Sequence, residues 1–163
     1  MAALYDVSDY IVVKLRDGGV FVNVLKLHKL VYYVQAWHLA FGRGRIFNGS
    51  FQAWVHGPVS RELYDRYKDT KTMYSLVDIA DVDPYFSVAR LHDSERAHID
   101  AVLEVYADFS GDQLEEMTHR EAPWLQARAN VPASARSETL ISDDVMREFY
   151  AARIQPQAAH ANA

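Results

Sequence analysis

The chain contains no cysteine, and only seven of its 163 residues are glycine and five are proline. Without cysteine there is no disulfide, no cysteine-ligated zinc or iron–sulfur centre, and no thiol nucleophile. This composition fits a reducing cytoplasm, which is the location we expect. Asp6 and Asp9 interrupt any apolar segment near the N-terminus, so no secretion signal is expected. No apolar run is long enough to span a bilayer, and we expect no membrane partner.

Basic charge is also scarce. The net charge is −5, and it is uneven: residues 1–70 carry nine Lys or Arg against six Asp or Glu, whereas residues 71–163 carry eight against sixteen. A chain without a long basic stripe is a poor candidate for binding nucleic acid, because phosphate neutralisation supplies most of that affinity. The acidic half is either ordinary solvated surface or a docking surface for a basic protein partner.

Apolar residues, by contrast, are plentiful. Hydrophobic residues make up 50% of the chain and aromatic residues 12%, which is enough to build a sizeable core in one domain. The spacing of these residues predicts a mainly α protein, a single compact helical domain over residues 1–154. The small-residue segment 155–163 is predicted to be a disordered tail. Such a tail is either a frayed end or a flexible signal for an unfoldase-type protease.

The most distinctive predicted helix runs from Asn23, a favourable N-cap, to Gly42, which stops it. Its apolar residues fall on two opposite stripes. Such a helix is usually central and packed all round, although one stripe could instead face a partner. Later helices are predicted from about residue 93, from a capping box at Ser110 and Gln113, and from Ser142, with a break near Pro123.

A small β-hairpin is predicted before the third helix. Two short β-favouring runs, 45–47 and 51–55, flank Asn48-Gly49, a pair typical of a type I′ turn. Pro58 is expected in the first turn of the third helix, where its missing N–H costs nothing. Gly57 is expected to hold a backbone conformation that sets this segment against the central helix. Gly57→Val should therefore destabilise the fold by roughly 1–3 kcal/mol.

No catalytic or metal-binding pattern stands out. The seven histidines lack metal-ligand spacing, and the nucleophile-elbow, dinucleotide-binding and P-loop patterns are all missing. We expect no metal, no cofactor and no catalytic residues. The aromatic residues are numerous, and tyrosine and tryptophan serve both cores and binding hot spots. A small enzyme that uses His38, His56 or His119 stays open as an alternative.

The helix and hairpin segments together resemble the Panacea domain, the SocA-like antitoxin family of bacteria and their phages. The resemblance covers about residues 22–129. It rests on a Lys-Leu-x-Lys-Leu-x-Tyr-Tyr helix that continues into Trp-His-Leu, then Ala-Trp-x-x-Gly-Pro-Val, a Leu-Tyr pair, Thr-His and Pro-Trp. The positions singled out as motif or partner-binding residues are Lys29, Tyr32, Tyr33, Trp37, His38, Trp54, Gly57, Pro58, Tyr64, Thr118, His119 and Trp124.

The resemblance implies an antitoxin that neutralises a cognate toxin by direct protein–protein binding. It also leaves open a proteolytic adaptor, which would deliver the toxin to a cytoplasmic AAA+ protease. No catalytic residue comes with the family. Partners vary within it, so the resemblance does not identify the toxin. The same motif positions can serve the fold as well as the toxin.

Overall fold

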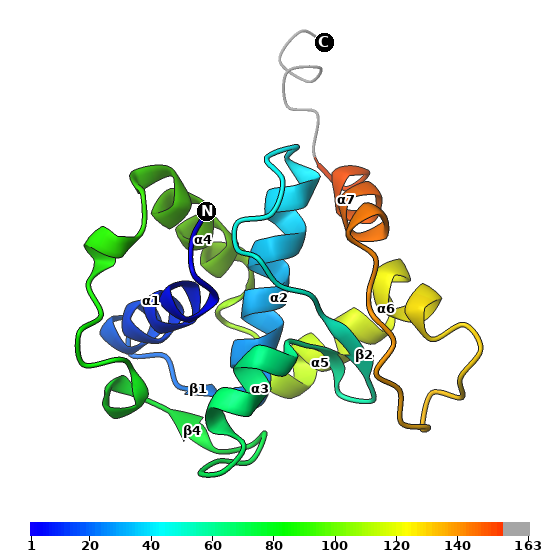
Figure 1. Cartoon of the computed structure of the whole chain (residues 1–163), viewed down its shortest axis with the longest axis horizontal. Coiled ribbons are helices and arrows are strands. Elements are labelled where there is room, and N and C mark those ends of the chain that lie inside the picture. The colour runs from blue at the N-terminus through cyan, green and yellow to red at the C-terminus, as the bar shows by residue number, and fades with distance from the viewer. Residues whose placement is uncertain (155–163) are drawn as a thin grey trace, which may run out of the picture.

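The computed structural model describes residues 1–154, and the predicted tail at 155–163 lies outside the described residues. The mainly α prediction is confirmed (Figure 1). In chain order the elements are α1 (Leu4–Asp17), β1 (Val22–Asn23), α2 (Val24–Ala40), β2 (Gln52–Trp54), β3 (Gly57–Val59), α3 (Arg61–Tyr67), β4 (Leu76–Val77), α4 (Asp93–Tyr106), α5 (Gly111–His119), α6 (Ala122–Ala127) and α7 (Asp143–Ala151). Two short 3-10 turns, Ile79–Asp81 and Val88–Arg90, interrupt the loop before α4.

Helix α2 is the centre of the molecule. It is buried along almost its whole length and contacts α1, α4, α5, α7 and β3, as predicted for a helix with two apolar stripes. Figure 1 shows α1 and α4 on one side of it and α6 and α7 on the other. The Asn23 side chain caps its start by accepting from the Lys26 N–H at 2.8 Å. Gly42 follows its end with φ +75°, a conformation that glycine adopts without strain.

A β-hairpin does precede α3, but its position differs from the prediction. The paired strands are β2 and β3, in the register Gln52↔Val59 and Trp54↔Gly57, so the turn is Val55-His56 and not Asn48-Gly49. The earlier run is held by α2 instead. The Gln35 amide donates to the carbonyl of Phe47 at 2.9 Å and accepts from the Ile46 N–H at 2.9 Å. The first of these bonds uses the Phe47 carbonyl, which a hairpin turning at Asn48-Gly49 would need for its own pairing.

Pro58 lies in β3 and not in the first turn of α3, so that prediction is wrong. Helix α3 begins at Arg61 because Ser60 caps it: the Ser60 hydroxyl accepts from the Leu63 N–H at 3.2 Å. Gly57 has φ +89°, which confirms that its backbone is unusual. Glycine alone adopts that conformation readily.

Further backbone pairings were not predicted, and two of them tie distant segments together. β1 pairs antiparallel with β4, which ties the start of α2 to the long loop before α4. The segment before α7 returns to β2, where the Ala53 N–H donates to the Thr139 carbonyl and the Ile141 N–H to the Phe51 carbonyl, both at 2.8 Å. The predicted capping box of α5, Ser110 with Gln113, is confirmed. Among the described residues, no helix meets the length and hydropathy needed to cross a membrane.

Candidate functional site

Four of the singled-out residues meet where β3 passes between α2 and α5, and we call them the junction: Lys29, Gly57, Pro58 and Thr118. Lys29 is fully buried, and its Nζ donates to the Pro58 carbonyl at 2.8 Å. A Cβ at Gly57 would lie 2.7 Å from Thr118 Oγ1 and 2.9 Å from Lys29 Cε. Gly57 is therefore required twice, by its positive φ and by this close approach.

Burial dominates the electrostatics of the junction. It lowers the pKa of Lys29 to about 7, against a weaker opposing influence from Glu115. His28, one residue earlier on α2, is also fully buried, and burial holds its pKa well below the usual value. Its Nδ1 accepts from the Ser60 N–H at 3.3 Å. A neutral imidazole and a largely neutral amine thus support the hairpin without a buried charge at alkaline pH.

Three side chains clamp the hairpin backbone from α5 and α6. Trp124 Nε1 donates to the Trp54 carbonyl and His119 Nε2 to the Val55 carbonyl, each at 2.7 Å. Arg128, just after α6, donates to the Ala53 carbonyl at 2.7 Å. The rings of His119 and Trp124 stack with centroids 4.2 Å apart. The Thr-His and Pro-Trp parts of the motif therefore fix consecutive carbonyls of β2 and its turn.

Tyr32 and Tyr33 are buried in an aromatic cluster, and the half-buried Trp37 packs against it. Tyr33 and Tyr150 both donate to one Glu121 oxygen, at 2.7 and 2.8 Å. Trp37 Nε1 donates to the Tyr106 hydroxyl at 2.8 Å, and Tyr33 stacks on Tyr106 with centroids 4.0 Å apart. Burial raises the pKa of Glu121, while the two hydroxyls oppose that rise.

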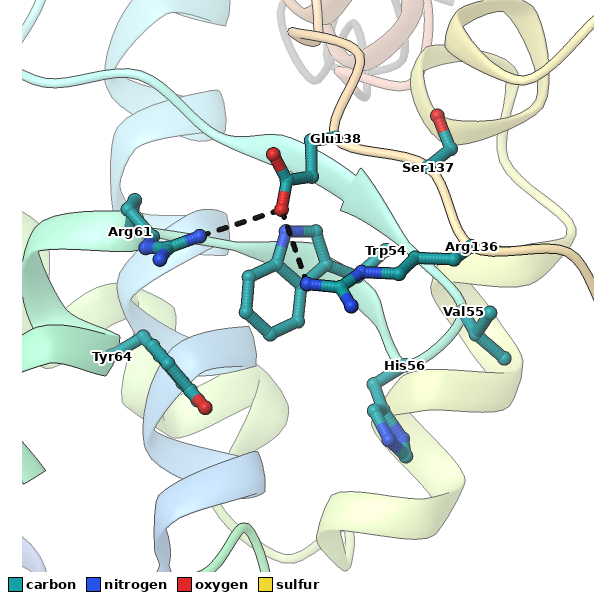
Figure 2. Close-up of a pocket in the computed structure, with 8 residues that line it drawn as sticks. All are labelled: Trp54, Val55, His56, Arg61, Tyr64, Arg136, Ser137 and Glu138. Carbon is teal, nitrogen blue, oxygen red and sulfur yellow. Dashed lines mark hydrogen bonds and ion pairs between the residues drawn. The ribbon is translucent and has the colours of Figure 1, made fainter. Parts of the chain in front are cut away.

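Trp54 and Tyr64 line an open cavity beside the hairpin, and Trp37 lines a separate, smaller cavity next to α4. We call the cavity beside the hairpin the hairpin groove; its volume is about 370 Å³, and it is lined by Trp54, Val55, His56, Arg61, Tyr64, Arg136, Ser137 and Glu138. Figure 2 shows the Trp54 indole between Arg61 and Arg136, with Glu138 drawn to both arginines. The Trp54 and Tyr64 rings meet edge-on with centroids 4.9 Å apart.

The three candidate histidines are not assembled into one site. His38 Nδ1 lies 2.6 Å from the Gly44 carbonyl, so it donates there. His56 faces Glu115, with Nδ1 3.1 Å from Oε1, and His119 is used by the hairpin clamp. Within residues 1–154 no group of three His, Asp or Glu side chains is arranged to hold a metal ion.

Sequence reasoning missed five residues that shape these sites: Glu121, Arg128, Arg61, Arg136 and Glu138. Glu121 and Arg128 are half-buried or buried charges, and their contacts join segments more than 70 positions apart. The three groove residues come from α3 and from the loop before α7. No local pattern marks them, since charged residues in loops and at helix starts are normally solvated surface.

The comparisons with known proteins agree with the motif. The family model described as "Antitoxin SocA-like, Panacea domain" matches residues 27–125, well over half of the 163 residues. No curated protein and no solved structure matches the chain. The matched segment contains all but the first three residues of the central helix, the hairpin, α3 to α5 and the first part of α6. Membership supports an antitoxin role, with a toxin as partner in general terms. The chain belongs to the SocA-like antitoxin family, and residues 27–125 are its Panacea domain.

Proposed function

We propose that this protein neutralises its cognate toxin by direct, stoichiometric binding, and that the hairpin groove is part of the toxin-binding surface. The observation that carries the proposal is a division among the motif residues. Most of them are buried or bonded inside the fold, whereas Trp54 and Tyr64 are partly exposed side by side in one groove. Trp37 is also partly exposed, but it lines a separate and smaller cavity of about 240 Å³. Partly exposed tryptophan and tyrosine side chains are the residue types that most often dominate protein interfaces.

The chemistry of the motif supports a binder and not an enzyme. Lys29 donates to a carbonyl, and Thr118 Oγ1 donates to the Glu115 carbonyl at 2.7 Å. His119 is held by Val55 and stacked on Trp124. A nucleophile or general base needs a free atom within reach of its substrate, and these atoms have structural partners instead.

The rigidity of the hairpin also favours binding. Its backbone is fixed by β2–β3 pairing, by the clamp from α5 and α6, and by the Thr139 contact. A surface fixed before it meets its partner loses less conformational entropy on binding. The groove therefore presents Trp54 and Tyr64 already in place.

The test uses a toxin identified as the product of a neighbouring gene that is toxic alone and harmless when produced with this chain. The purified pair should co-elute on size exclusion, and neutralisation should be complete only when antitoxin matches toxin in amount. If a trace of this protein inactivates excess toxin without co-elution, the proposal is wrong and an enzyme is indicated.

The second candidate function is a proteolytic adaptor. The same toxin and antitoxin can be used to distinguish an adaptor from a direct binder. An adaptor needs one surface for the toxin and another for the protease, and it lowers the amount of toxin in cells. A direct binder leaves the amount of toxin unchanged while removing its effect. Immunoblots of the toxin with and without this chain, after translation is stopped, separate the two.

A further inference from the structure

The charge of the hairpin groove is unlike that of the chain. Its lining carries two arginines against one glutamate, a net charge of +1, in a chain whose net charge is −5. Both arginines face the same oxygen. Arg61 Nη1 lies 3.5 Å from Glu138 Oε1, and Arg136 Nη2 lies 3.4 Å from that atom (Figure 2). The Glu138 carboxylate is therefore shared by two guanidinium groups.

These ion pairs are weak enough to exchange. The side chain of Arg136 is 87% exposed and that of Glu138 48% exposed, and exposed ion pairs contribute little because water screens them. Among the described residues, Glu138 is the only carboxylate within ion-pair distance of Arg136. Arg61 has a second partner, Asp65, at 3.3 Å. A carboxylate from outside can therefore replace Glu138 without leaving a buried charge unpaired.

The backbone that carries Arg136 and Glu138 is anchored at both ends. Before it, Arg128 donates to the carbonyls of Pro132 at 2.9 Å and Ala133 at 3.3 Å, and also to that of Ala135. After it, the Thr139 carbonyl accepts from β2 at 2.8 Å. The side chain of Glu138 can swing aside while the loop stays in place, so that Arg136 remains beside Trp54.

The floor of the groove is aromatic. The guanidinium of Arg61 lies 5.6 Å from the centroid of Tyr64 and 6.0 Å from that of Trp54. A ligand that reaches both arginines therefore also contacts two rings. An acidic side chain next to an apolar or aromatic one has the matching chemistry, because guanidinium groups bind carboxylates well and rings pack against rings.

We propose that the hairpin groove binds an acidic side chain of the protein partner, flanked by an aromatic or apolar residue, and that Glu138 occupies this position in the free protein. The partner carboxylate displaces Glu138 from Arg61 and Arg136. The flanking residue packs on Trp54 and Tyr64. That the partner is the toxin rests on the proposed function; the acidic specificity of the groove does not.

The test uses the full chain and two short probes, N-acetyl-Phe-Glu-Phe-amide and its Glu-to-Gln analogue. Nitrogen-15 NMR follows the indole N–H signals of the three tryptophans, with the Trp54 signal assigned from Trp54→Phe. The Glu peptide should shift the Trp54 signal in a saturable way, with an affinity in the millimolar range. The Gln peptide should bind at least about fivefold more weakly.

Two variants test the exchange. Glu138→Gln removes the internal competitor and should tighten binding of the Glu peptide about threefold or more, whereas the double change Arg61→Gln and Arg136→Gln should weaken it at least about fivefold. The matched control is Arg120→Gln, which breaks an exposed ion pair with Glu116 on α5 and should change nothing. Equal binding of the two peptides, no shift at Trp54, or an affinity unchanged by Glu138→Gln would each overturn the proposal.

The toxin complex separates this inference from the proposed function. If the Glu peptide binds as expected but no toxin co-elutes, the groove specificity stands and the proposed function fails. If the toxin co-elutes while the peptides do not bind and Glu138→Gln leaves the complex unchanged, the proposed function stands and this inference fails.

Discussion

The β2–β3 hairpin borders two very different regions, the junction with α2 and α5 and the groove beside α3. In the junction the polar atoms of Lys29 and Thr118 each have a partner inside the protein, and Gly57 leaves no room for a side chain. In the groove the charged side chains of Arg61, Arg136 and Glu138 face water.

This difference separates the motif residues that hold the fold together from those that are available for binding. Residues of both regions belong to the same run of motif positions, and Trp54 and Gly57 even pair across the hairpin. Yet a change in the junction acts first on the fold, whereas a change in the groove acts first on what the groove can bind.

The largest effect is expected at Gly57. Gly57→Val places a branched side chain at φ +89° and within 2.7 Å of Thr118 Oγ1. Backbone strain and overpacking each cost about 1–3 kcal/mol, so we expect a loss of about 4 kcal/mol in the free energy of unfolding. Urea denaturation, followed by circular dichroism, measures it.

Gly44→Val is the matched control for Gly57→Val. Gly44 has φ +75°, but nothing lies within 4 Å of where its Cβ would be. This variant carries the strain without the close approach, and it should lose only about 1 kcal/mol. If the two variants were equally stable, the junction would not depend on the packing of Gly57 against Lys29 and Thr118.

The next effect is a pH dependence due to Lys29. Above pH 10.5 this side chain is neutral in both the folded and the unfolded chain. Between 10.5 and its folded pKa of about 7, the unfolded chain binds a proton that the folded chain does not, so stability falls as pH falls. Below about pH 7, Lys29 is charged in both the folded and the unfolded chain, and stability falls no further from this cause.

Lys29→Met keeps the apolar stem and removes this titration. Going from pH 9.5 to 7.5, the wild type should lose roughly 2–3 kcal/mol relative to Lys29→Met, at about 1.4 kcal/mol per pH unit. Urea denaturation of both proteins at the two pH values gives the difference. If the free energy of unfolding changed equally with pH in both proteins, Lys29 would not change its charge on folding in this range.

The fold was predictable where local signals and tertiary packing agree. Helix α2 begins after Asn23 and ends before Gly42, as predicted, and its two apolar stripes predicted its central position. The hairpin was displaced because Asn48-Gly49 is a local signal that tertiary contacts overrode. The Gln35 side chain hydrogen-bonds the Phe47 carbonyl and the Ile46 N–H. Gln35 lies on α2, 12 and 11 residues before them in the chain.

The site was predictable only in part, for a related reason. The motif pointed to Trp54 and Tyr64, but nothing local separated them from the buried Tyr32 and Tyr33. Exposure depends on which segments cover a residue. The groove is completed by the loop before α7, more than 70 positions after Arg61 along the sequence, and that loop carries no motif.

A smaller effect, confined to binding, is expected at Trp54. Trp54→Ala should weaken toxin binding about 30-fold, or about 2 kcal/mol, because it removes a central aromatic contact. Isothermal titration with the toxin measures this, and thermal melting checks that the fold is retained. Tyr85→Ala, at a tyrosine that is 84% exposed in the loop before α4, should bind as the wild type does. Equal losses from both changes would remove the hairpin groove from the toxin interface.

The smallest effect is expected at His56, and it tests whether this histidine acts as a catalyst. His56 lines the groove, is 41% exposed and makes one polar contact, with Glu115. Exposed pairs of this kind are worth at most about 1 kcal/mol, so His56→Ala should lower toxin affinity by less than about 0.5 kcal/mol. The dose of antitoxin that neutralises a fixed amount of toxin should stay the same. A catalytic histidine would behave otherwise: the variant would fold, melt normally and fail to neutralise at any dose. That outcome would revive the enzyme alternative, because His56 is the one candidate histidine that lines the groove.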